Sequence, residues 1–305
     1  MSATAQQTEQ EAVHPALFET VLELIRRTST ILPDDVVRAI GTAHATEEKG
    51  SNADVALNII GCNIGLAKDK SAPICQDTGT ILFYIHTPVG YDQLALEEAA
   101  TEAVREATRK GYLRQNSVDS LTGKNSGDNT GPGSPVFHFH QWRRPHVEIK
   151  VMLKGGGCEN MNAQYSLPHP DLGGRDLAGV ENAILDCVLQ AQGQGCGPGI
   201  LGVCIGGDRG TSYAFAKEQL LRFLDDTNQD PVLGDLEKRI VDKANQSGIG
   251  PMGFGGKTTL LACKIGVANR LPASFFVSIA YMCWAYRRRG VEIDCASGAA
   301  VGWLY

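Results

Sequence analysis

Several features that define common classes of protein are missing from this sequence of 305 residues. No run of about 20 apolar residues is present, which excludes a conventional transmembrane helix, and the N-terminal segment lacks the basic and apolar regions of a secretory signal. Lys and Arg number 28 against 34 Asp and Glu, so the chain has no basic excess of the kind that binds nucleic acid. We therefore expect a cytoplasmic protein that binds neither nucleic acid nor a membrane.

A C-x-x-C pair is also missing, although the chain contains nine cysteines. An odd number without a secretory signal argues against disulfides. Cys295 stands near the C-terminus without partners, and four cysteines in apolar patterns are interpreted as core residues: Cys62, Cys187, Cys204 and Cys263. Four others occupy polar or glycine-rich turns: Cys75, Cys158, Cys196 and Cys283. Because iron–sulfur ligands need no fixed spacing, a cluster held by cysteines distant in sequence stays open.

Glycine, by contrast, is abundant, with 35 residues. Because glycine weakens helices and strands, its excess marks turns and places where backbone approaches a ligand. We expect an α/β (or α+β) fold in one domain over residues 14–305, with a helical N-terminal layer at 14–70, a mixed-sheet core at 71–290 and glycine-rich loops at the strand ends. Residues 1–13 are polar, and we expect them to be disordered.

Hydrophobic periodicity places the elements of this core. Helices are predicted at 94–109, 177–192, 211–224 and 234–246, and strands at 81–87, 135–142, 146–154, 200–205, 260–268 and 275–282. Between them, residues 117–134 form a polar loop that is longer than a connection requires, which is typical of functional or disordered loops.

Two patterns between Gly248 and Thr259 are typical of phosphate binding, but both fail in context. The GxGxxG pattern at 248–253 follows a predicted helix and not a strand. The Gly-Lys-Thr sequence at 256–258 has Pro251 where a P-loop has its first glycine, and proline offers no N–H to phosphate. A tight structural loop is the favoured interpretation.

His138 and His140 lie two residues apart on one face of a predicted strand, where they could chelate a metal ion. No cysteine or acid at metal-ligand spacing accompanies them locally. We therefore favour a pair of structural or exposed histidines over a zinc site.

Five motifs occur in an order that resembles the α-type part of class I fumarate hydratases and tartrate dehydratases. They are Pro73-Ile-Cys-Gln-Asp-Thr-Gly79, Lys154-Gly-Gly-Gly-Cys-Glu-Asn160, Cys196-Gly-Pro198, Gly248-Ile-Gly-Pro-Met-Gly253, and Cys283-Trp-Ala285 with Arg287-Arg288. The resemblance extends from about residue 15 to residue 290. It implies an oxygen-sensitive hydro-lyase that adds or removes water on a small hydroxy-dicarboxylate, such as fumarate/malate or a tartrate-like compound.

The resemblance also implies the site residues. Cys75, Cys196 and Cys283 would hold a 4Fe-4S cluster in which one iron lacks a cysteine ligand and is open to substrate. Asp77 would assist at the departing hydroxyl, although an aspartate before Thr-Gly also suits a simple turn. Substrate would be bound by Gln76, Arg114, Gly156 and Gly157. For Arg114 the alternative is a solvated arginine at a helix end. Arg287 to Arg289 would neutralise the surroundings of the cluster or form a partner surface.

Two departures from the family pattern concern the substrate. Leu271 stands where many members have a histidine, and Cys158 stands where fumarases often have serine and tartrate dehydratases have cysteine. A substituted C4/C5 dicarboxylate of the mesaconate type is therefore an alternative substrate. A non-catalytic iron–sulfur binding protein on the same scaffold is an alternative function.

The resemblance implies a partner as well, because the family's β-type half supplies further substrate-binding residues and a C–H base. The chain ends at Tyr305 without such a half. We expect a separate β-type subunit and an assembly such as α2β2. The apolar tail Ala299–Tyr305 is a candidate docking segment, and its alternative is a last buried strand.

Overall fold

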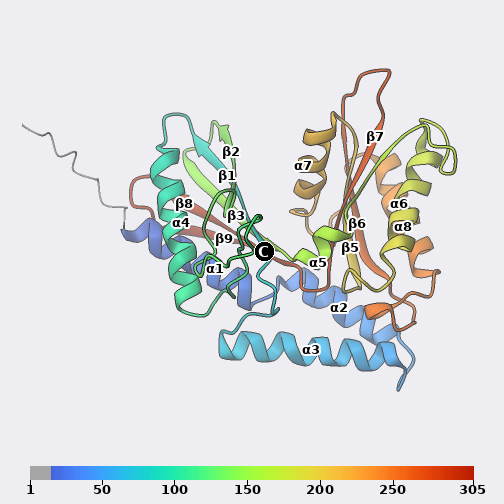
Figure 1. Cartoon of the computed structure of the whole chain (residues 1–305), viewed down its shortest axis with the longest axis horizontal. Helices are drawn as coiled ribbons and strands as arrows, with labels where there is room; N and C mark the ends of the chain where they lie inside the picture. Colours follow the sequence, from blue (N-terminus) through green and yellow to red (C-terminus); the bar gives the residue numbers. More distant parts are fainter. Residues whose placement is uncertain (1–14) are drawn as a thin grey trace, which may run out of the picture.

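The protein is built as two lobes, each around one β-sheet, that are joined along one side by two helices (Figure 1). The structure is a computed structural model and describes residues 15–305. The expectation of disorder at residues 1–13 lies outside the described residues. In the described range no helix is both long and apolar enough to span a membrane.

The first lobe contains a five-stranded sheet in the order β2-β1-β3-β8-β9. Its strands are β1 (Thr80–Pro88), β2 (Val136–Trp142), β3 (His146–Lys154), β8 (Arg287–Asp294) and β9 (Ala300–Leu304). Strand β1 runs parallel to β2 and antiparallel to β3. Helices α1 (Pro15–Thr30) and α4 (Gln93–Arg109) cover one face, because their apolar sides join the inner side chains of β1, β3 and β8 in one core.

The second lobe contains a four-stranded sheet in the order β4-β7-β5-β6. These strands are β4 (Ala163–Ser166), β5 (Gly199–Gly206), β6 (Leu260–Ala268) and β7 (Phe276–Met282). Helices α6 (Leu177–Ala191) and α8 (Pro231–Asn245) pack on one face of this sheet, and α7 (Arg209–Gln219) packs on the other, toward the first lobe. Strand β5 is parallel to β6 and antiparallel to β7, so the sheets are mixed, as predicted.

A third apolar cluster joins the lobes to each other. It contains Leu82 and Met152 from the first sheet and Ile200 and Met282 from the second. Helices α2 (Asp34–Thr46) and α3 (Asn52–Lys70) close it from below. Because both lobes bury side chains in this shared core, they are held as one body.

The expected α/β class is confirmed, and most predicted elements occur within a few residues of their predicted bounds. The helix predicted to continue to residue 224 ends at Gln219. The chain turns there, and the backbone N–H of Leu224 then donates to the carboxylate of Asp35 at 2.9 Å. The tail at 300–304 forms β9 as an edge strand beside β8, with Val301 and Trp303 exposed.

Strand β8 was not predicted, because it begins with three consecutive arginines. Arg287 and Arg288 are nevertheless fully buried, so neither forms a partner surface. Arg288 donates to the Asp35 carboxylate at 2.5 Å, and its guanidinium lies over the rings of Tyr286 and Tyr305. Its Nε and Nη1 have no hydrogen-bond partner in the described chain, but Asp35 balances its charge and the two rings stack on its guanidinium.

The glycine-rich loop at 248–259 binds a carboxylate side chain of the protein itself. The buried carboxylate of Glu47 accepts hydrogen bonds from the backbone N–H groups of Lys257 and Thr258 at 2.9–3.0 Å. The ammonium of Lys257 is turned away to the carbonyl of Thr46 at 2.9 Å. The loop therefore pins α2 to the second lobe.

Replacing this internal anion tests its structural role. We expect Glu47→Ala to lower the free energy of unfolding by about 3 kcal/mol, because it leaves buried N–H groups without their charged acceptor. The matched control is Glu48→Ala, since Glu48 is exposed and should change stability by less than about 0.5 kcal/mol. Urea denaturation followed by circular dichroism measures both, and equal losses would show that the Glu47 contacts carry no stability.

Candidate functional site

The carboxylate of Asp77 is the best-held polar group at the junction of the two lobes. Its Oδ1 accepts from the backbone N–H of Gly79 at 2.8 Å and from the side-chain amide of Asn116 at 2.9 Å. Its Oδ2 accepts from the backbone N–H of Gly156 at 2.6 Å. Three donors from three separate segments fix the carboxylate, so the turn interpretation of Asp77 accounts for only the bond to Gly79.

Close backbone contact brings these segments together. Gly79 has a φ of 76°, and a Cβ atom at this position would overlap the carbonyl group of Lys154. Only glycine tolerates both the conformation and the contact. A Cβ atom on Gly155 would lie 3.2 Å from Asp77 Oδ2, which is also tighter than usual. The triple glycine therefore lets the short helix α5 (Gly156–Asn160) present its first N–H to Asp77.

Four thiols lie near one another beside the Asp77 turn, and none of the nine cysteines is in a disulfide. The backbone N–H of Asp77 points to Cys75 Sγ at 3.4 Å. The neighbouring Cys283 lowers the pKa of Cys158, on α5, to about 7, with help from the positive charges of Lys154 and Arg287. The pKa of Cys283 rises in turn. The pKa of Cys196 is raised by burial and by the nearby Cys158, Cys75 and Asp77.

The turn that carries Cys196 is shaped by its neighbours. Cys196 has a left-handed φ of 55°, a conformation that costs a non-glycine residue about 1 kcal/mol. Its carbonyl accepts from the N–H of Trp284 at 3.2 Å, which ties it to the Cys283 segment. The carbonyl of Gly197 accepts from the N–H of Met252 at 3.0 Å. The loop at 248–259 thus supports a predicted cluster ligand.

Arg287 lies beside these thiols and is incompletely satisfied. Its Nη1 donates to the backbone carbonyl of Asp77 at 2.7 Å. Its Nε and Nη2 atoms are buried and have no hydrogen-bond partner among residues 15–305. An arginine stays charged in proteins, and a buried charge requires compensation. An anionic group among the thiols would supply it.

These residues fit an iron–sulfur cluster by donor type and charge. Free thiols are soft ligands suited to such clusters, and the unpaired guanidinium of Arg287 favours an anion beside them. In the described part of the chain no three His, Cys, Asp or Glu side chains are placed to hold a single metal ion. The fit therefore rests on chemistry and not on coordination distances.

A pocket of about 330 Å³ opens beside Asp77. Asp77, Gly156, Asn116 and Ser134 line it, so the polar loop at 117–134 forms one wall. The backbone of Arg114 is tied to Thr78 by bonds of 2.7 and 2.9 Å, which places this residue next to the Asp77 turn. The side chains of Arg114 and Gln76 are exposed.

The structure thus gathers Cys75, Cys158, Cys196 and Cys283 around Asp77, next to Gly156. Leu271 lies on the exposed loop between β6 and β7, with 73% of its surface accessible. That loop is at the end of the second lobe opposite to α5 (Figure 1). Within one chain, Leu271 therefore does not reach the site.

Three residues at the site were missing from the sequence-based assignment: Asn116, Arg287 and Cys158. Asn116 follows Arg114 by two residues in a polar loop, where nothing distinguishes it from its neighbours. The sequence analysis assigned Arg287 only a general role, in which its positive charge neutralises the surroundings of the cluster. Cys158 was noted because it follows three glycines in a predicted turn. Its contact with Cys283, however, depends on the packing of α5 against β7.

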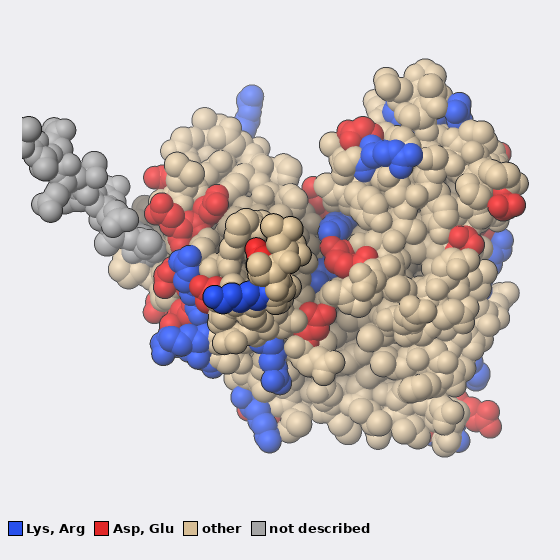
Figure 2. Space-filling model, in the orientation of Figure 1, with Lys and Arg blue, Asp and Glu red and all other residues tan. Residues whose placement is uncertain are grey.

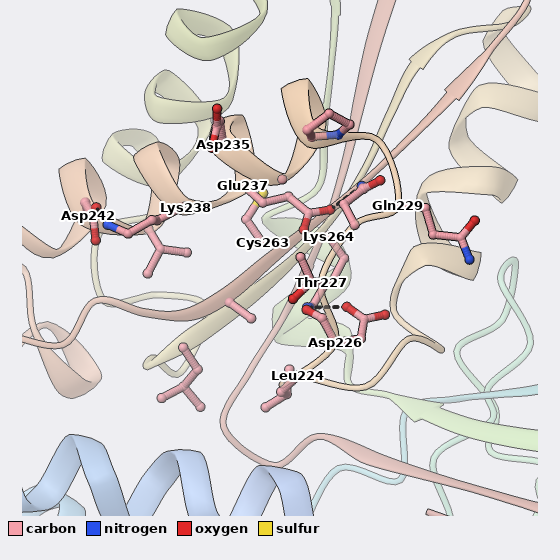
Figure 3. A pocket seen from close by; sticks show the side chains of 16 residues that line it. Leu224, Asp226, Thr227, Gln229, Asp235, Glu237, Lys238, Asp242, Cys263 and Lys264 are labelled. Carbon is pink, nitrogen blue, oxygen red and sulfur yellow. Dashed lines mark hydrogen bonds and ion pairs between the residues drawn. The ribbon is translucent and has the colours of Figure 1, made fainter.

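Two further cavities in the described chain have different linings. The cavity of about 580 Å³ between α8 and β6 is lined by Asp226, Glu237 and Lys264 (Figure 3). Lys264 pairs with Asp226 at 2.6 Å, and Glu237 accepts from Arg222 at 2.8 Å. These charges therefore satisfy one another.

The cleft between the lobes, visible in Figure 2, is lined by His140 of the predicted histidine pair and by His86. His138 stacks on Tyr84 with ring centroids 4.7 Å apart, and His140 stacks on His86 at 5.2 Å. The two histidines belong to a ladder of rings along β1 and β2.

Comparison with known proteins gives consistent matches. The chain matches the family described as fumarate hydratase (Fumerase) over residues 18–292. It is 53% identical over 293 residues to a Geobacillus stearothermophilus protein described as a class I fumarate hydratase, covering 95% of this chain but only 57% of that protein. It is 33% identical over 285 residues to a Methanocaldococcus jannaschii protein described as an L(+)-tartrate dehydratase subunit alpha, covering 91% and 98%. Identity to the L(+)-tartrate dehydratase subunit alpha of Escherichia coli K12 is 30% over 289 residues, covering 93% and 92%.

The backbone contact at Gly79 can be tested by adding one methyl group. We expect Gly79→Ala to lower the free energy of unfolding by about 2 kcal/mol more than Gly123→Ala, because the added Cβ meets the Lys154 carbonyl. Gly123 is the control, since it has a similar φ of 68° but nothing within 4 Å of its Cβ position. Urea denaturation of both variants measures the difference, and equal stabilities would refute the contact.

Proposed function

Because the chain belongs to the fumarate hydratase family, we propose that it is the α-type, cluster-bearing part of a hydro-lyase that reversibly adds or removes water on a small hydroxy-dicarboxylate. The observation that carries this proposal is the Asp77 carboxylate, held by three donors between free thiols and a pocket of about 330 Å³. That volume is of the size that small-molecule sites have.

The proposed cofactor is a 4Fe-4S cluster held by Cys75, Cys196 and Cys283. Such a cluster, with one iron free of cysteine, supplies a Lewis acid for a substrate hydroxyl when bound. Arg287 would offset the negative charge of the thiolates, since its two unpartnered nitrogens are buried next to them. Cys158 would line the same space without being a ligand.

Asp77 is the proposed acid–base residue. Its Oδ1 already accepts two hydrogen bonds, whereas its Oδ2 accepts one. A carboxylate oxygen has two lone pairs, so Oδ2 can take one further hydrogen bond from a substrate hydroxyl. When that lone pair instead carries a proton, Oδ2 donates it to the departing hydroxyl group, which leaves as water; in the reverse direction the ionised Oδ2 takes a proton back from the water that adds.

The proposed substrate-binding groups differ in whether they are available for a hydrogen bond with substrate. The N–H of Gly156 is occupied by Asp77, so Gly157 offers the next N–H, because N–H groups in the first turn of a helix have no acceptor within the helix. The guanidinium of Arg114 suits a carboxylate, which it can grip with two parallel hydrogen bonds. The side chain of Gln76 is exposed, and we assign its amide to a hydrogen bond with substrate.

We further propose a separate β-type partner, in an assembly such as α2β2. The chain spans nearly the whole length of the two relatives described as alpha subunits, but only 57% of the Geobacillus protein. A partner of the kind that the name subunit alpha implies for those relatives would supply the further residues of the catalytic site. Co-expression with such a partner is therefore part of each activity test below.

The cluster ligands are tested by iron content. We expect Cys196→Ser to lose most of the roughly four irons per chain that a cubane cluster contains, measured with sulfide content and absorption near 400 nm after anaerobic reconstitution. Cys187→Ser is the control, because Cys187 is buried in the core of the second lobe and should leave iron content unchanged. Equal iron losses would overturn the ligand assignment, and no iron in the well-folded wild type would overturn the cofactor.

The role of Asp77 is tested by Asp77→Asn in the reconstituted enzyme. We expect kcat to fall by about 100- to 1,000-fold, because an amide cannot transfer the proton, while iron content stays at the wild-type level. Asp92→Asn is the control, since Asp92 caps α4 on the surface and asparagine caps equally well. Fumarate, malate, tartrate and mesaconate are the substrates to compare. A cluster-loaded wild type that turns over none of them would favour a non-catalytic iron–sulfur protein.

A further inference from the structure

The side chain of Asn129 forms four hydrogen bonds in the polar loop that walls the pocket. Its Oδ1 accepts from the backbone N–H groups of Asn116 at 2.7 Å and Ser117 at 3.2 Å. Its Nδ2 donates to the backbone carbonyl of Arg114 at 2.7 Å and to the hydroxyl of Thr108, on α4, at 2.9 Å. A side-chain amide has two acceptor lone pairs and two N–H groups, so its hydrogen-bonding capacity is fully used.

The position of Asn129 favours asparagine for two separate reasons. Its backbone has a left-handed φ of 63°, which asparagine adopts more readily than most residues with a side chain. Its side chain is buried, with 2% of its surface exposed, so each lost hydrogen bond would leave a polar group unpaired. Glycine would tolerate the backbone conformation but would supply none of the four side-chain bonds.

These bonds fix the segment that carries two groups of the candidate site. The carbonyl of Arg114 accepts from the Thr78 hydroxyl at 2.9 Å as well as from Asn129. Its backbone is thus held between the Asp77 turn and the polar loop. Asn116 is held by Asn129 through its backbone N–H, and its exposed side chain donates to Asp77 Oδ1 at 2.9 Å. A single residue therefore connects Asn129 with the Asp77 carboxylate.

The hydrogen bond from Asn116 determines which oxygen of Asp77 can carry a proton. Oδ1 accepts from Gly79 and from Asn116, so both of its lone pairs are occupied. Oδ2 accepts one bond, from Gly156, and keeps a lone pair for a proton. Without the Asn116 amide, Oδ1 would regain a lone pair, and the proton would be divided between the two oxygens. The oxygen assigned to the substrate hydroxyl would then be protonated less often.

We propose that Asn129 is a positioning residue, whose side-chain amide holds Asn116 against Asp77, so that the proton is directed to Oδ2, and holds Arg114 beside the same pocket. The proposal rests on the proposed function, because it assigns Asn129 an effect on that reaction. The polar loop at 117–134 is then a fixed support of the site, since its buried asparagine ties the site segment to α4.

The first test is the steady-state kinetics of the cluster-loaded chain, co-expressed with its β-type partner. We expect Asn129→Ala to lower kcat by about 10- to 100-fold, because a displaced Asn116 no longer directs the proton of Asp77, while iron content stays at the wild-type level. Asn116→Ala removes only an exposed side chain, so it tests the same route without disturbing the loop, and kcat should fall to the same extent. The double variant should be no slower than either single variant, because residues that act through one another are not additive.

Asn129→Asp separates the two contacts of the amide. The carboxylate keeps an acceptor for the N–H of Asn116, but it places an oxygen where Nδ2 donates to the Arg114 carbonyl. We expect kcat to stay within about threefold of the wild type and KM to rise by about 10-fold, because Asn116 stays in place while Arg114 is displaced. A merely structural role would not divide the two constants in this way.

Asn228→Ala is the control for a general loss of stability. Asn228 is a partly buried asparagine of the second lobe, and its Nδ2 donates to Glu237 at 2.8 Å and to the carbonyl of Ile265 at 2.9 Å. It lines the cavity between α8 and β6, apart from the Asp77 pocket. This variant should be less stable in urea than the wild type but should keep the wild-type kcat and KM.

Hydrogen exchange, followed by mass spectrometry, tests the positioning without any turnover. The N–H groups of Asn116 and Ser117 should exchange at least about 10-fold faster in Asn129→Ala, because they lose their acceptor. Unchanged exchange would overturn the proposal. So would an active wild type whose Asn129→Ala or Asn116→Ala variant keeps its kcat, and in that case the proposed function would still stand. A cluster-loaded wild type without turnover would instead overturn the proposed function, and with it the effect assigned to Asn129.

Discussion

The candidate site depends on the close approach of two turns at one end of the first sheet. Strands β1 and β3 are antiparallel neighbours, and their register pairs Thr80 with Lys154. The turn before β1 and the turn after β3 therefore meet, and Gly79 has no side chain to hold them apart. The first of these turns carries Cys75 and Asp77, and the second leads into α5 with Cys158. One backbone contact thus determines whether the carboxylate reaches the N–H of Gly156.

Electrostatics then determine what this junction can hold. Lys154 and Arg287 are both fully buried there. Lys154 is paired with Glu159 at 2.7 Å, whereas Arg287 keeps two nitrogens without a partner in the described chain. These positive charges favour the thiolate form of Cys158 and lower its pKa. An excess of buried positive charge beside thiols favours anionic ligands, which is the property that a thiolate-bound cluster and a dicarboxylate share.

Helices α2 and α3, which close the shared core from below, also support the candidate site. Asp35 of helix α2 accepts a hydrogen bond from Arg288. Glu47, directly after α2, accepts hydrogen bonds from the loop that supports Cys196. Helix α3 leads directly into the Cys75 turn.

Periodicity and composition by themselves determined the α/β class, the mixed sheets and the bounds of most elements, because hydrophobic spacing reports which side of an element is buried. The motifs, through family resemblance, predicted Cys75, Asp77, Cys196 and Cys283. Strand β8 escaped detection because the partners of its arginines, Asp35 and the Asp77 carbonyl, lie more than 200 residues away. The place of Asn116 at the Asp77 carboxylate and the approach of Cys158 to Cys283 were likewise decided by tertiary structure. The physical reason is that strand register and the packing of two lobes determine which turns meet, and neither is encoded in local spacing.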